Sequence, residues 1–115
     1  MLFRPRPALS ADDARALGDA FARALNDIPV VRRARVGKRI TIGRDYEQLM
    51  AVDYEYAAVI EFDDVAGLKE YLKHPAHEEM GRRFFDAIEA GLVYDFEMET
   101  GAEAVATLLE RRGGV

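Results

Sequence analysis

Residues 54–62 read YEYAAVIEF and form the clearest strand pattern in the chain. Alternate positions from the first residue onward carry aromatic and small or aliphatic side chains, so one face of the predicted strand is apolar. Ala57 and Val59 lie on the other face, between two glutamates. We therefore expect both faces to be partly buried, as in a strand that lies inside a layered structure.

The sequence on either side alternates between helical and extended patterns. Ser10 is a good N-cap for a helix with Asp13 three residues on, and Pro29 ends that helix. The full prediction is a strand over 1–4, a helix over 10–28, a strand over 30–42, a loop over 43–53, the strand over 54–62, a helix from Asp63 or Asp64 to residue 74, a second helix from Pro75 to Gly91, and a last strand over 92–98. This β-α-β-β-α-β order predicts an α+β fold of the ferredoxin-like type.

Both histidines of the chain lie in the run YLKHPAH, residues 71–77. Pro75 must break the helix, because a proline excludes the helical conformation from the residue before it and suits the first turn of a new helix. His74 is expected to cap that new helix. The spacing of the two histidines would suit a metal site on one continuous helix, but the break removes that geometry. We therefore expect no metal.

Three segments resemble the stress-responsive dimeric α/β-barrel family, called Dabb: residues 54–62, residues 71–77 and Tyr94-Asp95-Phe96. The resemblance covers roughly residues 1–98. It implies a ferredoxin-like monomer, and a homodimer whose two sheets close into a barrel. Known members include oligomeric stress proteins and olivetolic acid cyclase, which closes a polyketide chain without a cofactor.

The resemblance also implies site residues. The catalytic tyrosine and histidine of the cyclase fall on Tyr71 and His77, and a pocket histidine of its third strand falls on Tyr56. We expect a pocket between sheet and helices that contains these residues and Phe84, with His74 as a further substrate-binding residue. A neutral imidazole could take a proton from carbon next to a carbonyl, and a phenol could steady the enolate oxygen.

Three functions remain open at this point. The leading hypothesis is a stress-response-type dimer that binds a small apolar or aromatic molecule. The first alternative is a cofactor-free polyketide cyclase or isomerase that uses Tyr71 and His77. The second alternative is a purely structural oligomeric stress protein, in which the histidine is a satisfied structural residue. Whether the protein is an enzyme is left undecided.

The composition limits the kinds of partner that we expect for this protein. The chain has 115 residues, a formal net charge of −5 and no cysteine. No leader and no apolar stretch of membrane-spanning length is recognisable, so we expect a cytoplasmic protein without a membrane partner. A cluster of six cations over residues 32–44 is expected to protect an edge strand rather than bind nucleic acid, because Glu55 and Glu61 on the next strand would repel phosphate.

The domain prediction is one domain over residues 1–99, followed by a tail over 100–115. Thr100 and Glu103 form a capping-box pattern, and Val105, Leu108 and Leu109 make a short apolar stripe. A helix of about ten residues is marginal alone. We therefore expect this helix to dock on a neighbouring surface, such as the partner chain.

Overall fold

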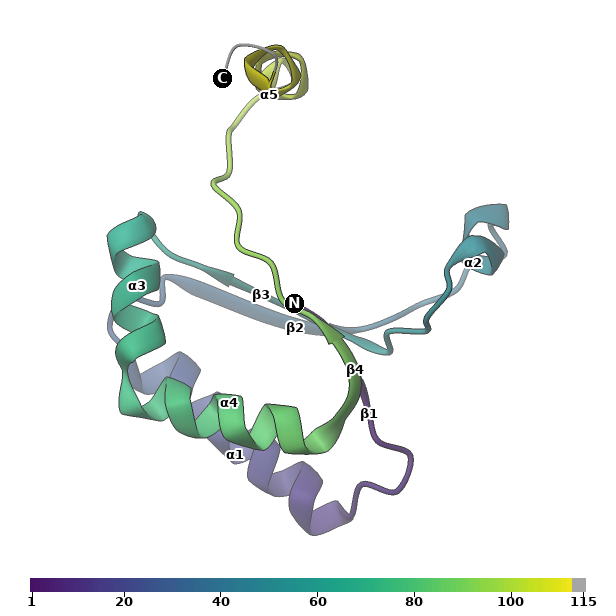
Figure 1. Ribbon diagram of the computed structural model, residues 1–115, viewed down its shortest axis with the longest axis vertical. Helices are drawn as coiled ribbons and strands as arrows, with labels where there is room; N and C mark the ends of the chain where they lie inside the picture. The colour runs from purple at the N-terminus through teal and green to yellow at the C-terminus, as the bar shows by residue number, and fades with distance from the viewer. Residues whose placement is uncertain (113–115) are drawn as a thin grey trace.

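The computed structural model describes residues 1–112 and shows the predicted strands and helices in the predicted order, with one additional short helix between the second and third strands (Figure 1). The elements are β1 (Leu2–Pro5), α1 (Ala11–Asp27), β2 (Arg33–Lys38), α2 (Asp45–Leu49), β3 (Tyr56–Glu61), α3 (Val65–Lys73), α4 (Pro75–Ala87), β4 (Ile88–Leu92) and α5 (Ala104–Arg112).

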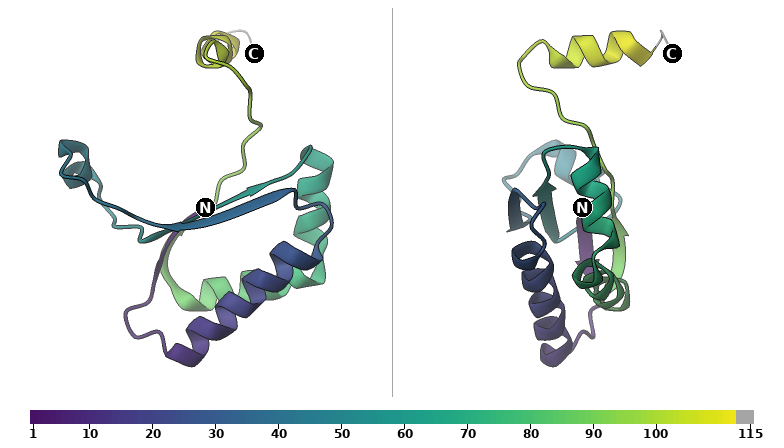
Figure 2. Two further views of the ribbon diagram at one scale, coloured as in Figure 1. Left: turned by 180° about the vertical axis from the view of Figure 1, so that it is seen from behind. Right: turned by 90° about the vertical axis from the view of Figure 1, so that its left-hand side faces the viewer.

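The four strands form one antiparallel sheet in the order β2-β3-β1-β4. Helices α1 and α4 lie side by side on one face of this sheet, and α3 stands at one end (Figures 1 and 2). Two helices crossing one face of a four-stranded antiparallel sheet are the ferredoxin-like arrangement, so the predicted monomer fold is confirmed.

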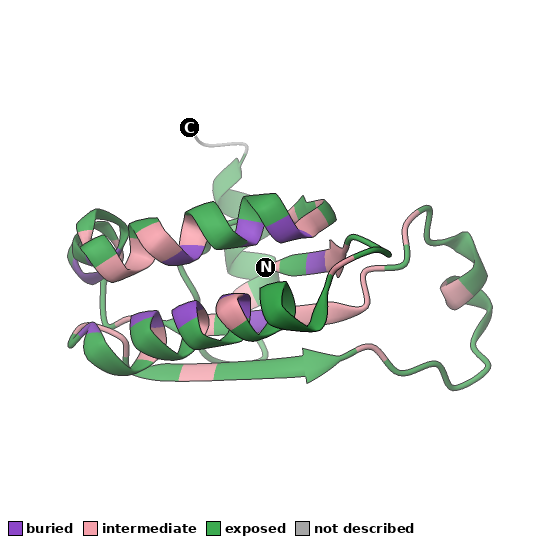
Figure 3. Ribbon diagram, turned by 90° about the horizontal axis from the view of Figure 1, so that it is seen from below, coloured by how far each residue is buried: buried purple, intermediate pink, exposed green. Residues whose placement is uncertain are grey.

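The core lies between the sheet and the two long helices. Ala20 and Ala24 are small residues that let α1 pack closely against the rest of the core, and both are almost completely buried. Along the two long helices, buried positions alternate with exposed ones (Figure 3). The buried residues of this layer are Phe3, Leu17, Ala20, Ala24, Ile28, Tyr71, Met80, Phe84 and Ala87. Burying these apolar surfaces is the main favourable contribution to folding.

The opposite face of the sheet is the outer face. Leu2 lies opposite Ala57 in β3 and opposite Leu92 in β4, so these side chains share this face. Val59, on the same face, is 48% exposed. No second layer from residues 1–112 covers it (Figure 1). The expectation that both faces of this strand are partly buried holds for Ala57, which is half-buried, but not for Val59 in the single chain.

Local signals placed several helix ends correctly. The Ser10 hydroxyl accepts a hydrogen bond from the Asp13 N–H at 3.1 Å, and the Asp64 carboxylate accepts one from the Gly67 N–H at 2.8 Å. Helix α3 ends at Lys73 and α4 begins at Pro75, so the predicted break is confirmed.

The end of the second helix was predicted four residues too late. Helix α4 stops at Ala87, and β4 runs from Ile88 to Leu92. Strand pairing decides this boundary, because Ile88 lies opposite Pro5 on β1. Strand β4 ends at Leu92, where it lies opposite Leu2 near the end of β1, so the predicted last strand over 92–98 is wrong within one chain. Residues 93–98 find no partner strand among the described residues.

Three further boundaries differ. The strand predicted over 30–42 pairs only over Arg33–Lys38, and the predicted loop over 43–53 contains the short helix α2. Helix α5 begins at Ala104, whose N–H bonds to the Gly101 carbonyl, so the predicted capping box at Thr100 does not form. Residues 113–115 of the predicted tail lie outside the described residues. Among residues 1–112, no helix is long and apolar enough to cross a membrane.

Candidate functional site

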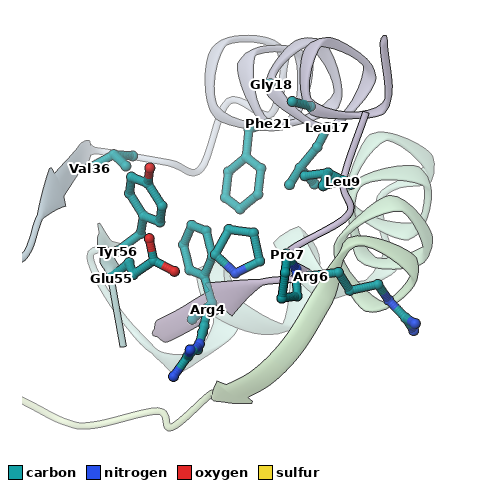
Figure 4. A pocket seen from close by; sticks show the side chains of 13 residues that line it. Arg4, Arg6, Pro7, Leu9, Leu17, Gly18, Phe21, Val36, Glu55 and Tyr56 are labelled. Carbon is teal, nitrogen blue, oxygen red and sulfur yellow. The ribbon is translucent and has the colours of Figure 1, made fainter. Parts of the chain in front are cut away.

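An open pocket of about 680 Å³ lies between the sheet and the first half of α1 (Figure 4). We call it the α1 pocket. Its floor comes from β1 and β3, its roof from α1, and its far side from the chain that joins β1 to α1. The lining residues are Phe3, Arg4, Pro5, Arg6, Pro7, Leu9, Ala14, Leu17, Gly18, Phe21, Val36, Glu55 and Tyr56.

Aromatic rings dominate the pocket wall. Phe3 lies opposite Tyr56 across the β1–β3 ladder, and their ring centroids are 5.6 Å apart in a stacked arrangement. Phe21 of α1 faces Phe3 with a centroid distance of 6.2 Å. A Cβ built on Gly18 would meet no atom within 4 Å, so this glycine leaves the roof open. The wall therefore suits a flat apolar or aromatic molecule.

Charged residues occupy the rim of the α1 pocket. Arg4 pairs with Glu89 at 3.3 Å, and the Arg4 and Arg6 side chains extend away from the ring cluster (Figure 4). Glu55 lies beside Tyr56 at the β3 side. The polar groups are thus placed to orient a ligand at the entrance, while the interior is apolar.

A second candidate site lies at the α3–α4 corner, where Tyr71 lies in the last turn of α3 and His77 in the first turn of α4. The Pro75 break turns the chain, and the two rings meet with a centroid distance of 4.6 Å. Phe62 closes the other side of Tyr71, with ring centroids 5.0 Å apart. Tyr71 is buried and His77 is half-buried.

Two polar atoms of this corner have no hydrogen-bond partner. They are the Tyr71 hydroxyl and His77 Nδ1, and they are the only buried side-chain polar atoms of residues 1–112 in that condition. Burial raises the pKa of Tyr71 to about 12. Burial also lowers the pKa of His77, against smaller opposing effects of the Leu72 backbone and the Glu78 carboxylate. At pH 7 the corner therefore holds a neutral phenol and a neutral imidazole.

The remaining predicted site residues lie apart from this corner. His74 caps α4, as predicted, and its Nδ1 accepts the Ala76 N–H at 3.1 Å. Phe84 is 2% exposed and packs edge-on against Phe3 in the core. Tyr56 lines the α1 pocket, whereas Tyr71, His77 and Phe84 do not. The expectation of one pocket lined by all four is therefore wrong.

Sequence reasoning missed most of the α1 pocket. Leu17 and Phe21 lie on one apolar stripe of the predicted helix over 10–28, and Phe3 lies in the predicted strand over 1–4, but neither pattern predicts a pocket. The available signal was Gly18, a glycine inside a helix beside that stripe, because such a position costs helix stability and often has a packing or functional reason. Among residues 1–112, no group of three or more acidic or histidine side chains is placed to hold a metal ion.

The family comparison covers all four strands of the sheet and helices α1 to α4. The model of the stress-responsive A/B barrel domain, Dabb, matches residues 1–98. The chain belongs to the Dabb family. The matched range ends after residue 98, so α5 lies outside it.

Solved structures of the same fold are distant in sequence. The Arabidopsis thaliana protein At3g17210 superposes with a TM-score of 0.70 at 22% identity, covering 88% of this chain and 93% of that one. A dimeric ferredoxin-like protein of unknown function from Jannaschia sp. has a TM-score of 0.65 at 25% identity, covering 84% and 93%. A similar dimeric protein from Thermobifida fusca has a TM-score of 0.57 at 22% identity, covering 77% of each chain. Among curated proteins, none matches this Dabb chain.

Proposed function

We propose that this Dabb protein is a homodimer that binds a small apolar or aromatic molecule in the α1 pocket. The observation that supports the proposal is the pocket itself, an aromatic-walled space of about 680 Å³. Ligand pockets of proteins are commonly about 300–1,000 Å³ and combine an apolar wall with a few polar groups. The rings of Phe3, Phe21 and Tyr56 offer both flat and edge contacts to such a ligand.

Gly18 provides a test that separates binding from folding. Gly18→Leu would fill the space under the roof of the pocket and would also favour the helix, since glycine costs about 0.8–1 kcal/mol against alanine in a helix interior. We expect the variant to be at least as stable as wild type and to lose binding of 8-anilinonaphthalene-1-sulfonate and of acetophenone, measured by fluorescence and calorimetry.

Gly81→Leu is the matched control. Gly81 is also a helical glycine with open space around its Cβ position, and it does not line the α1 pocket. This variant should keep wild-type binding. Equal binding of both probes by wild type and Gly18→Leu would remove the α1 pocket as the binding site, and no binding by wild type in a wider screen would favour a purely structural oligomer.

A second candidate function is cofactor-free cyclisation of a polyketide-like carbonyl compound at the α3–α4 corner. It is favoured by the two partnerless polar atoms and by the neutral state of both rings. His77 would take the proton from carbon next to a carbonyl, and the Tyr71 hydroxyl would donate to the enolate oxygen. The imidazolium would then return its proton to the alkoxide of the aldol product, which leaves both residues unchanged.

Substitution of Tyr71 and of His77 distinguishes a catalytic role of these residues from a structural one. Under the cyclase hypothesis, His77→Ala and Tyr71→Phe should each reduce turnover of a poly-β-ketone thioester by roughly 10²–10⁴-fold, with near-normal melting temperatures. Under a structural role, His77→Ala should instead lower stability by roughly 1–3 kcal/mol. Loss of stability in both variants with no turnover by wild type would rule out the enzyme.

A further inference from the structure

We propose that the α1 pocket selects aromatic molecules that carry a protonated amine, and that the Glu55 carboxylate holds the ammonium group at the pocket rim. The inference rests on the proposed function of the α1 pocket and names the chemical class of its ligand. Three observations carry it: a half-buried carboxylate without a partner, neighbouring cations that are already paired, and a wall of aromatic rings.

Glu55 is the acidic residue among those that line the α1 pocket. It directly precedes β3 and is half-buried, and its carboxylate lies next to Tyr56 (Figure 4). Within residues 1–112, this carboxylate takes part in no salt bridge and in no hydrogen bond. A half-buried carboxylate has lost part of its hydration, so a ligand that donates hydrogen bonds to it makes a favourable contact.

Two cations beside Glu55 already have other carboxylate partners. On the β2 side, the Arg39 N–H donates to the Glu55 carbonyl at 2.8 Å, but the Arg39 guanidinium donates to the Asp53 carboxylate at 2.7 Å. On the β1 side, Arg4 pairs with Glu89 at 3.3 Å. These two pairs neutralise their own charges, which leaves the negative charge of Glu55 to attract a cationic ligand.

Two further cations near the pocket are less well placed to bind a ligand. Arg6 lines the pocket, but it is exposed and its side chain extends away from the rings (Figure 4). Lys38 lies opposite Tyr56 in the β2–β3 ladder and does not line the pocket. Solvent and salt screen exposed charges, so these two cations contribute little to the binding of an anion. The charged group next to the rings is therefore the anionic Glu55.

The aromatic wall adds to the attraction of a cation. The face of an aromatic ring attracts an ammonium group that lies within about 6 Å of the ring centroid. Phe3, Phe21 and Tyr56 present such rings to the pocket. Because Glu55 and Tyr56 are adjacent in the chain, an aromatic body can lie against the rings while its ammonium group reaches the carboxylate. A volume of about 680 Å³ is sufficient for a bicyclic ring with a short amine arm.

Three matched probes test the charge of the ligand. They are 2-naphthylmethylamine, 2-naphthylmethanol and 2-naphthoate, which share one ring system and differ in the charge of the head group. We expect wild type to bind the amine about tenfold more tightly than the alcohol, and the carboxylate most weakly, in titrations followed by naphthalene fluorescence. Added salt should reduce the preference for the amine and leave the dissociation constant of the alcohol nearly unchanged.

Glu55→Gln removes the charge and keeps the size of the side chain. The dissociation constant of the amine should rise about tenfold, to near that of the alcohol. The same variant should bind 8-anilinonaphthalene-1-sulfonate more tightly than wild type, because the sulfonate no longer meets a carboxylate. Glu61→Gln is the matched control, because Glu61 is the last residue of β3 and does not line the pocket. This control should keep the wild-type preference for the amine.

The outcomes separate the selection of an amine from the proposed function. Equal affinity of wild type for the amine and the alcohol overturns the amine selection alone, as does tighter binding of 2-naphthoate or a preference for the amine that persists in Glu55→Gln. The salt dependence needs no variant, so it decides the matter should Glu55→Gln fold poorly. Failure of wild type to bind any of the three probes, or wild-type binding of them by Gly18→Leu, overturns both this inference and the proposed function of the α1 pocket.

Discussion

Tyr71 and His77 meet because Pro75 ends one helix between them and begins another. On an uninterrupted helix, residues six apart lie on different faces, about 240° around the axis. The break brings the two rings within 4.6 Å between centroids. Their burial in the same corner shifts both pKa values in the direction of the neutral forms.

The lowered pKa of His77 predicts a pH dependence of stability. The unfolded chain binds a proton at the ordinary histidine value of about 6.5, whereas the folded chain resists protonation. The free energy of unfolding should therefore be fully retained above about pH 6.5 and fall as the pH is lowered below it. Denaturant titrations of wild type and His77→Gln should diverge in this range, with the variant less sensitive to acid. Parallel curves for the two proteins would contradict the shift.

Substitution of Phe84 tests the packing of the core, because this residue lies in the core and does not line the α1 pocket. It is almost completely buried and packs against Phe3 and Phe21. Phe84→Ala should lower the free energy of unfolding by roughly 3–5 kcal/mol, measured by urea titration, because it leaves a cavity in the core. The neighbouring Phe85 is 69% exposed, and Phe85→Ala should cost less than about 1 kcal/mol. Similar losses in the two variants would contradict this assignment of Phe84.

At the scale of elements, strand pairing decided the boundaries that helix patterns left open. The apolar spacing of α4 continues through Ile88, yet the helix stops at Ala87 because the next residues pair with β1.

Helix α5 forms although no tertiary contact among the described residues accounts for it. It has nine residues, and nothing among residues 1–112 buries its apolar stripe. An isolated helix of this length is marginal, so docking on a partner would explain why it forms.

Leu108 tests the docking of α5. If the helix docks on the second copy, Leu108→Asp should lower the melting temperature by several degrees or weaken the dimer, because it places a charge in an apolar contact. Ala106→Asp, on the same helix, gives the control for the effect of a charge on the helix itself. No change in melting temperature or in the dissociation constant for Leu108→Asp would show that α5 does not dock.

At the scale of the whole molecule, the uncovered outer face is the feature that indicates a partner chain. The sheet is packed on one face only, and the segment that follows β4 and helix α2 both project beyond the body on the side of the outer face (Figure 1). A second copy on this face would bury its exposed apolar side chains and give the chain the second layer that sheets need. The dimers described for the Jannaschia and Thermobifida proteins are in keeping with this proposal.

We expect a dimer at micromolar concentration that buries more than about 1,000 Å² in total. Val59→Glu should weaken it by about tenfold or more, since a carboxylate would be buried without a partner. Phe85→Glu changes an exposed apolar residue on α4, which covers the opposite face of the sheet, and should leave the affinity unchanged. Sedimentation equilibrium measures both. Equal effects of the two substitutions would place the interface elsewhere.

The sequence by itself determined the element order, the ferredoxin-like monomer, the caps at Ser10 and Asp64, and the break at Pro75. These depend on local periodicity and on backbone chemistry within a few residues. Only the tertiary structure decided where β4 begins, that Tyr56 belongs to a different site from Tyr71 and His77, and that the α1 pocket exists. Pairing partners and cavities depend on residues far apart in the chain, such as Phe3 and Tyr56, whose meeting no local pattern encodes.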